Sequence, residues 1–216
     1  EEKIALGIKD KISHTKYKNP NDIWLSRSVF DDFKKCQRCF YLNRVKGFIP
    51  PGCPQFTINS MTDKLLKKEF DTCRKKQKPH QFLIDEKLDY IIPYKNEETA
   101  TDIYGDPIIG SNEEKPYTKM EAWRTNFHGI QARFNKTNYV LYGSVDDIWL
   151  NTKDNSLILV DYKSQANKNQ VNQETYWIGD FKSGYQRQLD FYVYLLKQQN
   201  FKEKISDDVY LLVVNA

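Results

Sequence analysis

The chain lacks long apolar runs and has few cysteines. None of its 216 residues lies in a stretch approaching the roughly 18 consecutive apolar residues that a membrane-spanning helix needs. Residues 1–11 show no basic segment followed by an apolar one, so no secretory signal is expected. Four cysteines are too few for a disulfide scaffold. These absences favour a reduced cytoplasmic protein that does not associate with membranes.

Several familiar catalytic motifs are also missing. The sequence contains no G-x-x-x-x-G-K-[ST], no G-x-S-x-G and no H-E-x-x-H. Its three histidines (His14, His80 and His128) are scattered and are interpreted as surface or structural residues. What the chain does have is 14% aromatic residues, which excludes a disordered composition and supports a real hydrophobic core.

The charge of the chain is unevenly distributed. Residues 1–80 carry 18 Lys and Arg against 9 Asp and Glu, whereas residues 81–216 carry 15 against 20. A basic part joined to an acidic part suggests that the first holds a polyanion while the second concentrates carboxylates. The candidate contacts for such a polyanion, beside Cys36, are Lys34, Lys35, Arg38 and Arg44. The alternative is an ordinary fluctuation of surface charge.

Hydrophobic periodicity predicts an α/β fold. The expected helices cover residues 25–45, 57–77 and 181–200, and the expected strands cover 127–134, 139–150, 157–163 and 208–214. Residues 80–122 are interpreted as a loop-rich insertion because the run 94–118 within them holds Gly, Pro, Asn and paired Glu residues. The order is αβββαβ around one central mixed sheet, preceded by an N-terminal helical segment. We therefore expect a basic segment over 1–56 and a core over 57–216.

The most informative stretch is a predicted antiparallel hairpin over residues 143–163. A two-residue turn at Lys153 and Asp154 would place Asp146 directly opposite Asp161. Opposed residues share a face of the sheet, and Lys163 shares it too because it lies two residues further along the strand. The hairpin therefore predicts two carboxylates and an amine in one place.

Two opposed carboxylates repel each other, so they need a cation between them or a shared proton. Oxygen ligands without a nearby histidine suit Mg²⁺ or Mn²⁺. An ion held there would bind a phosphate oxygen and activate water, and a lysine beside it could stabilise charge on phosphorus. The alternative is that Asp146 and Asp161 are solvated at a strand end, with Lys163 as a surface counter-charge.

These residues resemble the PD-(D/E)XK nuclease superfamily, and specifically its RecB/Cas4-like branch. The branch shows G-x-x-D, D/E-x-K and Q-x-x-x-Y in that order, which correspond here to residues 143–146, 161–163 and 188–192. Residues 25–42 are similar to the opening S-x-S…C-P-R-x-F-Y-L of the same branch.

The resemblance implies a restriction-endonuclease-like core and a metal-dependent deoxyribonuclease of DNA repair, recombination or defence. By resemblance, Asp146, Asp161 and the carbonyl of Tyr162 would hold the metal and Lys163 would be the catalytic lysine. Gln188 and Tyr192 would support the site or contact DNA.

The chain departs from the branch in its first core helix. Asp63 stands where the branch usually has a histidine, so the motif favours Asp63 as a further metal ligand. Glu69 is a rival, because it falls at the centre of the apolar face of residues 57–77 while Asp63 falls at the edge.

A second departure concerns cysteine. Relatives with an iron–sulfur cluster often have one N-terminal cysteine and three near the C-terminus, whereas here all four lie in the first third (Cys36, Cys39, Cys53 and Cys73). This argues against a cluster. Cys36 and Cys39 do have metal-ligand spacing, which leaves zinc open, with free thiols as the expectation.

Two other functions stay open at this point. The fold could serve as a non-catalytic nucleic-acid-binding module, or the site could hydrolyse small phosphoesters. The intact carboxylates and lysine favour an enzyme over the first, and the basic N-terminal third argues against the second. Exonuclease and endonuclease modes are equally compatible with the sequence.

Overall fold

The computed structural model describes residues 19–49, 51–52, 57–110, 115–165, 171–172, 176–177 and 182–215, with no side-chain placement for 57–59 and 182. The chain divides into two compact units. The first comprises residues 1–55 together with 133–142, and the second comprises residues 56–132 together with 143–216. Each unit is described by itself.

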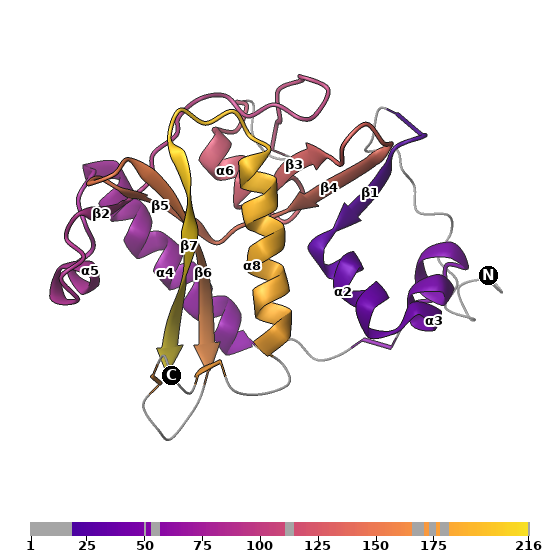
Figure 1. The fold of residues 1–216 in the computed structure, drawn as a ribbon, viewed down its shortest axis with the longest axis horizontal. Coiled ribbons are helices and arrows are strands. Elements are labelled where there is room, and N and C mark those ends of the chain that lie inside the picture. Colours follow the sequence, from indigo (N-terminus) through magenta and orange to yellow (C-terminus); the bar gives the residue numbers. More distant parts are fainter. Residues whose placement is uncertain are drawn as a thin grey trace. The chain divides into compact units, whose positions relative to one another are not determined.

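The first unit contains a short strand and three consecutive helical segments (Figure 1). They are β1 (Ile23–Ser26), α2 (Arg27–Lys35), α3 (Gln37–Phe40) and the π-helical η2 (Tyr41–Val45). The prediction of one helix over 25–45 is wrong in two respects. Leu25 lies in β1, which pairs in parallel with β4 (Tyr139–Gly143), and Cys36 adopts an extended conformation that interrupts the helix. Ser26 caps α2, because its side chain accepts a hydrogen bond from the backbone nitrogen of Val29.

A half-buried ion pair fixes the residue before β1 to the hairpin that carries β4. Both terminal nitrogens of Arg133 donate to the carboxylate of Asp22 at 2.8 Å. Arg133 ends β3 (Ile130–Arg133), which joins β1 and β4 in a three-stranded sheet of order β1-β4-β3. The bidentate geometry is the strongest form of such a pair.

The second unit contains a four-stranded mixed sheet of order β2-β5-β6-β7. Its strands are β2 (Ile91–Pro93), β5 (Asp147–Asn151), β6 (Ser156–Gln165) and β7 (Lys204–Asn215). The pairs β2–β5 and β5–β6 are antiparallel, whereas β6–β7 is parallel. The mixed α/β class predicted from the sequence is confirmed.

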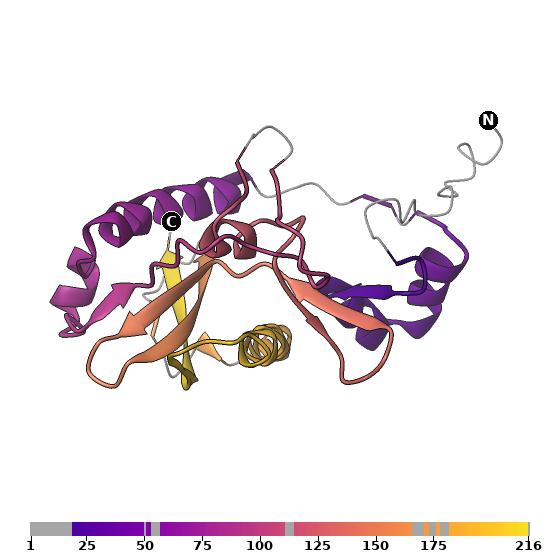
Figure 2. The ribbon, with the colours of Figure 1, turned by 90° about the horizontal axis from the view of Figure 1, so that it is seen from above.

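Two long helices flank this sheet. Figure 2 shows α4 (Thr57–Lys76) on one side of the strands and α8 (Lys182–Lys197) on the other. Both helices were predicted, with ends within three residues of those observed. Two short helices, α5 (Gln81–Asp85) and α6 (Lys119–Trp123), complete the unit. Among the described residues, no helix has the length and apolar character needed to cross a membrane.

Two strand predictions require correction. Residues 80–122 are not merely an insertion, because β2 lies within them and forms an edge of the sheet. Pro93 ends β2, and an edge strand tolerates proline because one side of its backbone is unpaired. Residues 139–150 form two strands that belong to different sheets, with a break over 144–146.

The register of the β5–β6 hairpin is as predicted. Asp147 pairs with Val160 and Asn151 pairs with Ser156, so the ladder extended by one residue brings position 146 opposite Asp161. The turn differs in detail. The ladder ends at Asn151 and Ser156, which leaves the four residues 152–155 in the loop.

The core between α4 and the sheet is rich in aromatic rings. Phe70 of α4 stacks on Trp149 of β5 with ring centroids 4.9 Å apart, and Tyr162 of β6 lies 5.8 Å from Phe70. Leu83 and Ile91 close the same cluster. The cluster places α4 firmly against β5 and β6, the strands that carry the candidate site.

A charged pair is buried within this interface. Arg74 of α4 donates to Asp147 at 2.6 Å and to the carbonyl of Tyr94 at 2.6 Å. The Asp147 carboxylate, which is fully buried, also accepts hydrogen bonds from the Tyr162 hydroxyl at 2.8 Å and the Trp149 ring nitrogen at 3.2 Å. Buried side chains of the protein itself supply all of these hydrogen bonds to the carboxylate, so Asp147 has a structural role.

We expect Asp147→Asn to lower the free energy of unfolding by about 3–5 kcal/mol, because it leaves the buried Arg74 guanidinium without its buried counter-charge and with the more exposed Asp71 as its acidic partner. Urea unfolding followed by circular dichroism measures the loss. The double variant Asp147→Leu/Arg74→Met should recover much of it, because no charge is then left unpaired. A loss below 1 kcal/mol for Asp147→Asn would contradict a structural ion pair.

Candidate active site

Asp146 lies in the break before β5, and its side chain returns toward β6. Its Oδ2 accepts a hydrogen bond from the backbone nitrogen of Tyr162 at 2.8 Å. Its Oδ1 lies 3.4 Å from the amine of Lys67, and the side chain is 25% exposed. Asp146 is therefore held by the strand opposite, while water and solutes can still reach its carboxylate.

Asp161 is the buried member of the pair. Its side chain is only 3% exposed, and its Oδ1 accepts a hydrogen bond from the Gln188 amide at 2.9 Å. Its Oδ2 forms an ion pair with the amine of Lys163. Burial raises the pKa of Asp161 to about 6; Lys163 opposes this shift and the neighbouring Asp146 adds to it. The mutual repulsion expected from the hairpin register is thus present.

Lys163 completes the expected triad. It points to the same side of β6 as Asp161, is 17% exposed, and places its amine 5.0 Å from the centre of the Tyr185 ring. Tyr185 belongs to α8, so the amine lies between the strand and that helix. A lysine anchored at one carboxylate and partly open to solvent can reach an anion bound beside it.

The two α8 residues of the Q-x-x-x-Y motif, Gln188 and Tyr192, make different contacts. Gln188 donates directly to Asp161, as described above. Tyr192 is buried, and its ring lies against Gly143, where an added Cβ would come within 2.5 Å of the ring. The glycine of the G-x-x-D motif is therefore required because the tyrosine of the third motif occupies the space of a side chain.

Asp63 reaches the site from α4, and Glu69 does not. Asp63 accepts from Lys67 at 2.9 Å, and Lys67 in turn contacts Asp146. Glu69 is 59% exposed and lies 3.6 Å from His80. The helix stripe that faces the sheet includes the polar residues Asp63, Lys67 and Arg74.

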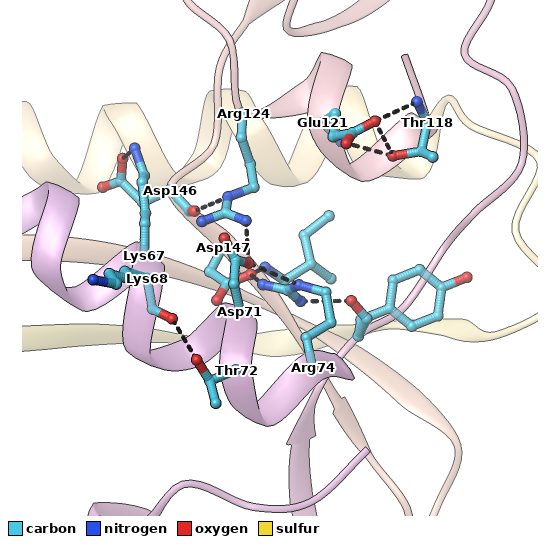
Figure 3. Close-up of polar contacts among 12 residues, drawn as sticks. Lys67, Lys68, Asp71, Thr72, Arg74, Thr118, Glu121, Arg124, Asp146 and Asp147 are labelled. Atoms are coloured by element: carbon cyan, nitrogen blue, oxygen red, sulfur yellow. Dashed lines mark hydrogen bonds and ion pairs between the residues drawn. The ribbon is translucent and has the colours of Figure 1, made fainter. Parts of the chain in front are cut away.

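Three residues beneath the site were not predicted from the sequence. Arg124 donates to the carbonyl of Asp146 at 3.1 Å and to Asp71 of α4 at 2.6 Å (Figure 3). Asp71 also accepts from Arg74 at 3.2 Å. This chain of contacts fixes the backbone of Asp146 to α4. No pattern in the sequence indicates this contact, because Arg124 precedes Asp146 by 22 residues and belongs to no motif.

The residues present fit a hard divalent cation. The donors that meet at the hairpin are carboxylate oxygens, which Mg²⁺ and Mn²⁺ prefer. The Asp161 carboxylate is buried, and the adjacent Asp146 carboxylate repels it. A cation between the two carboxylates would relieve this repulsion. Among the described residues, no three acidic, cysteine or histidine side chains converge into a ready-made metal cage.

The predicted nucleic-acid contacts belong to the first unit. Lys34 and Lys35 are exposed in the last turn of α2, and Arg38 is exposed in α3. Arg44 is exposed and lies 4.0 Å from Asp32.

Three of the four cysteines can be described. The sulfurs of Cys36 and Cys39 are 2.7 Å apart, and the hydrogen bond from Cys39 lowers the pKa of Cys36. Cys73 lies in α4. Cys53 lies outside the described residues.

Comparison with known protein families identifies the fold. A family model described as the PD-(D/E)XK nuclease superfamily matches residues 24–215. The chain belongs to the PD-(D/E)XK nuclease superfamily. No curated protein and no solved structure matches the chain. The superfamily match covers Asp146, Asp161 and Lys163 and indicates nuclease activity on a nucleic-acid substrate, with divalent metal ions as the usual cofactor.

The raised pKa of Asp161 predicts a pH dependence of stability without metal. An unfolded aspartate titrates at about 3.9, so the folded state binds the Asp161 proton more tightly. The stabilisation that comes from this tighter proton binding is fully present below about pH 4 and is lost as the pH rises through about 6. The total loss in the free energy of unfolding is roughly 1.4 kcal/mol for each unit by which the folded and unfolded pKa values of Asp161 differ.

The measurement is urea unfolding in EDTA between pH 4 and 7.5. The Asp161→Asn variant is the control, because an amide does not titrate and this part of the decline should disappear. Wild type and variant curves that run parallel across the range would show that Asp161 titrates normally.

Proposed function

We propose that the chain is a metal-dependent deoxyribonuclease of the RecB/Cas4-like branch that hydrolyses phosphodiester bonds with Mg²⁺ or Mn²⁺. The observation that carries the proposal is the group formed by Asp146, Asp161 and Lys163 on one side of the β5–β6 hairpin. The group is costly to fold without a cation. A superfamily member with no catalytic task would gain nothing by keeping it.

The metal would be held mainly by Asp146 and Asp161, with the carbonyl of Tyr162 as a third oxygen ligand. The Tyr162 N–H and the Gln188 amide support this assignment, because each already orients one of the carboxylates. Asp63 approaches from α4 but shares Lys67 with Asp146. When bound, the ion would act as a Lewis acid on the phosphate and lower the pKa of a water molecule.

The remaining steps fall to side chains of this chain. Lys163 would bind the phosphate oxygen that gains charge, since its amine is anchored next to the buried carboxylate of Asp161. Gln188 would keep Asp161 oriented throughout the reaction. Tyr192 packs on Gly143 and so would support the backbone before Asp146 rather than contact the substrate.

DNA binding is assigned to the basic residues of the first unit (Lys34, Lys35, Arg38 and Arg44). Their exposure and their lack of strong ion pairs within the described residues support this role, because each can neutralise a phosphate at little cost. A role in DNA repair, recombination or defence follows from the resemblance to the branch and stays a prediction. A cytoplasmic location, expected from the low number of cysteines, also stays a prediction.

The second candidate is a nucleic-acid-binding module without catalysis. The basic first unit is compatible with it, and the catalytic group argues against it. Incubation with labelled single-stranded DNA, double-stranded DNA and RNA, each with Mg²⁺, Mn²⁺ or EDTA, separates the two functions. Binding in every condition with cleavage in none would favour the module.

We expect Lys163→Met to lower the cleavage rate by at least about a hundredfold, because the amine that stabilises the developing charge is lost while the apolar stem is kept. The measurement is single-turnover cleavage of labelled DNA with Mn²⁺. Circular dichroism should show an intact fold, since the substitution leaves the buried Arg74–Asp147 pair untouched.

Lys204→Met provides the matched control, because Lys204 is exposed at the opposite end of the β6–β7 pair. It should cleave at the wild-type rate. Cleavage by Lys163→Met at a wild-type rate, or cleavage by wild type in excess EDTA, would contradict the proposed mechanism.

A further inference from the structure

Lys67 occupies an unusual position for a helix-surface lysine. Its amine lies 2.9 Å from Asp63, one turn earlier on α4, and 3.4 Å from Asp146, which comes from the break before β5. The side chain is 24% exposed. An i, i+4 pair of acid and lysine is common on helices, but the second carboxylate comes from a different part of the chain. Lys67 therefore joins the helix to the candidate metal site.

The neighbouring lysines of α4 lack such contacts. Lys64 and Lys68 are exposed, and no ion pair is found for either within the described part of the chain. Figure 3 shows Lys67 beside Asp146, whereas Lys68 contributes only its backbone carbonyl to a contact, with Thr72. The position of Lys67 is thus specific to this residue rather than a general property of a basic helix.

A charge count shows what Lys67 does to the site. With every group charged, the three carboxylates of Asp63, Asp146 and Asp161 and the two amines of Lys67 and Lys163 leave one negative charge. One divalent ion turns this into one positive charge, which a single phosphodiester neutralises. A second divalent ion would leave a strong excess of positive charge at the site. The amine of Lys67 also already lies between Asp63 and Asp146, the carboxylates that would have to bind that second ion.

We infer that Lys67 is a built-in cation that replaces a second metal ion, so that the site takes one divalent ion, on the Asp146–Asp161 side. In this arrangement Asp63 neutralises Lys67 instead of binding the ion directly. The inference rests on the proposed metal-dependent function and adds to it the number of ions and the residue that sets that number. Lys67 is a positioning residue, because it acts on the ion through Asp146.

The experiment counts Mn²⁺ ions bound by the full chain at pH 7.5, without DNA. Electron paramagnetic resonance measures the free Mn²⁺, and isothermal titration calorimetry gives the dissociation constant of the first ion. The variants are Lys67→Met, Lys67→Gln, the double variant Lys67→Met/Asp63→Asn, and Lys68→Met as the matched control. Thermal melts show whether each variant is folded, and Lys67→Gln replaces Lys67→Met if the latter does not fold.

Wild type and Lys68→Met should each bind one Mn²⁺ with the same affinity. Lys67→Met should either bind its first ion about tenfold more tightly, because a repelling positive charge is gone, or bind a second ion. The double variant should lose that gain, because the carboxylate exposed by removal of Lys67 is then an amide.

Two stoichiometric ions in wild type would overturn the inference, and so would Lys67→Met binding no more tightly than wild type with a single ion. A gain that survives in the double variant would overturn the role given to Asp63. If wild type binds no Mn²⁺ at all, the proposed metal-dependent function fails together with the inference. Binding by wild type with no effect of Lys67 leaves that function intact.

Discussion

The repulsion between Asp146 and Asp161 is the constraint around which the rest of the site is built. The hairpin register fixes their proximity, and burial raises the pKa of Asp161 to about 6. The surrounding groups each reduce part of this cost. The Tyr162 N–H and the Gln188 amide donate to one carboxylate each, while Lys67 and Lys163 supply positive charge. What they leave uncompensated is suited to a divalent cation.

Adjacent aspartates serve opposite purposes because they point in different directions. Asp147 begins β5, and its side chain points toward α4, where Arg74, Tyr162 and Trp149 satisfy it completely. Asp146 lies just before the strand and keeps a partly exposed carboxylate. Asp147 therefore anchors the helix that carries Lys67, and Arg124 fixes the backbone of Asp146. A residue that stabilises the fold and a candidate metal ligand are therefore neighbours in the sequence.

Much of the central hairpin could be predicted from the sequence, since side chains alternate along strands and a short turn limits the possible registers. The short strands β1 and β2 could not be predicted in this way. β1 and β2 have only four and three residues, too few for a periodic pattern, and they form only by pairing with strands distant in sequence.

The face of α4 was harder to predict for a different reason. A hydrophobic pattern places Met61, Leu65 and Glu69 on the buried side, yet the structure exposes all three. Besides Phe70, the helix turns Lys67 and Arg74 toward the sheet, because their charged partners Asp146 and Asp147 lie there. Those partners come from another part of the chain, so the spacing of apolar residues within the helix could not predict these contacts.

Thermal unfolding of wild type and Asp146→Asn, each with EDTA or with Mn²⁺, tests the central claim most directly. The account predicts that Mn²⁺ at a hundredfold excess over its dissociation constant stabilises wild type by about 2.7 kcal/mol. Asp146→Asn should keep the hydrogen bond from Tyr162, be at least as stable as wild type in EDTA, and gain almost nothing from Mn²⁺. Wild-type melting that is indifferent to saturating Mn²⁺ would contradict the claim that these opposed carboxylates form a metal site.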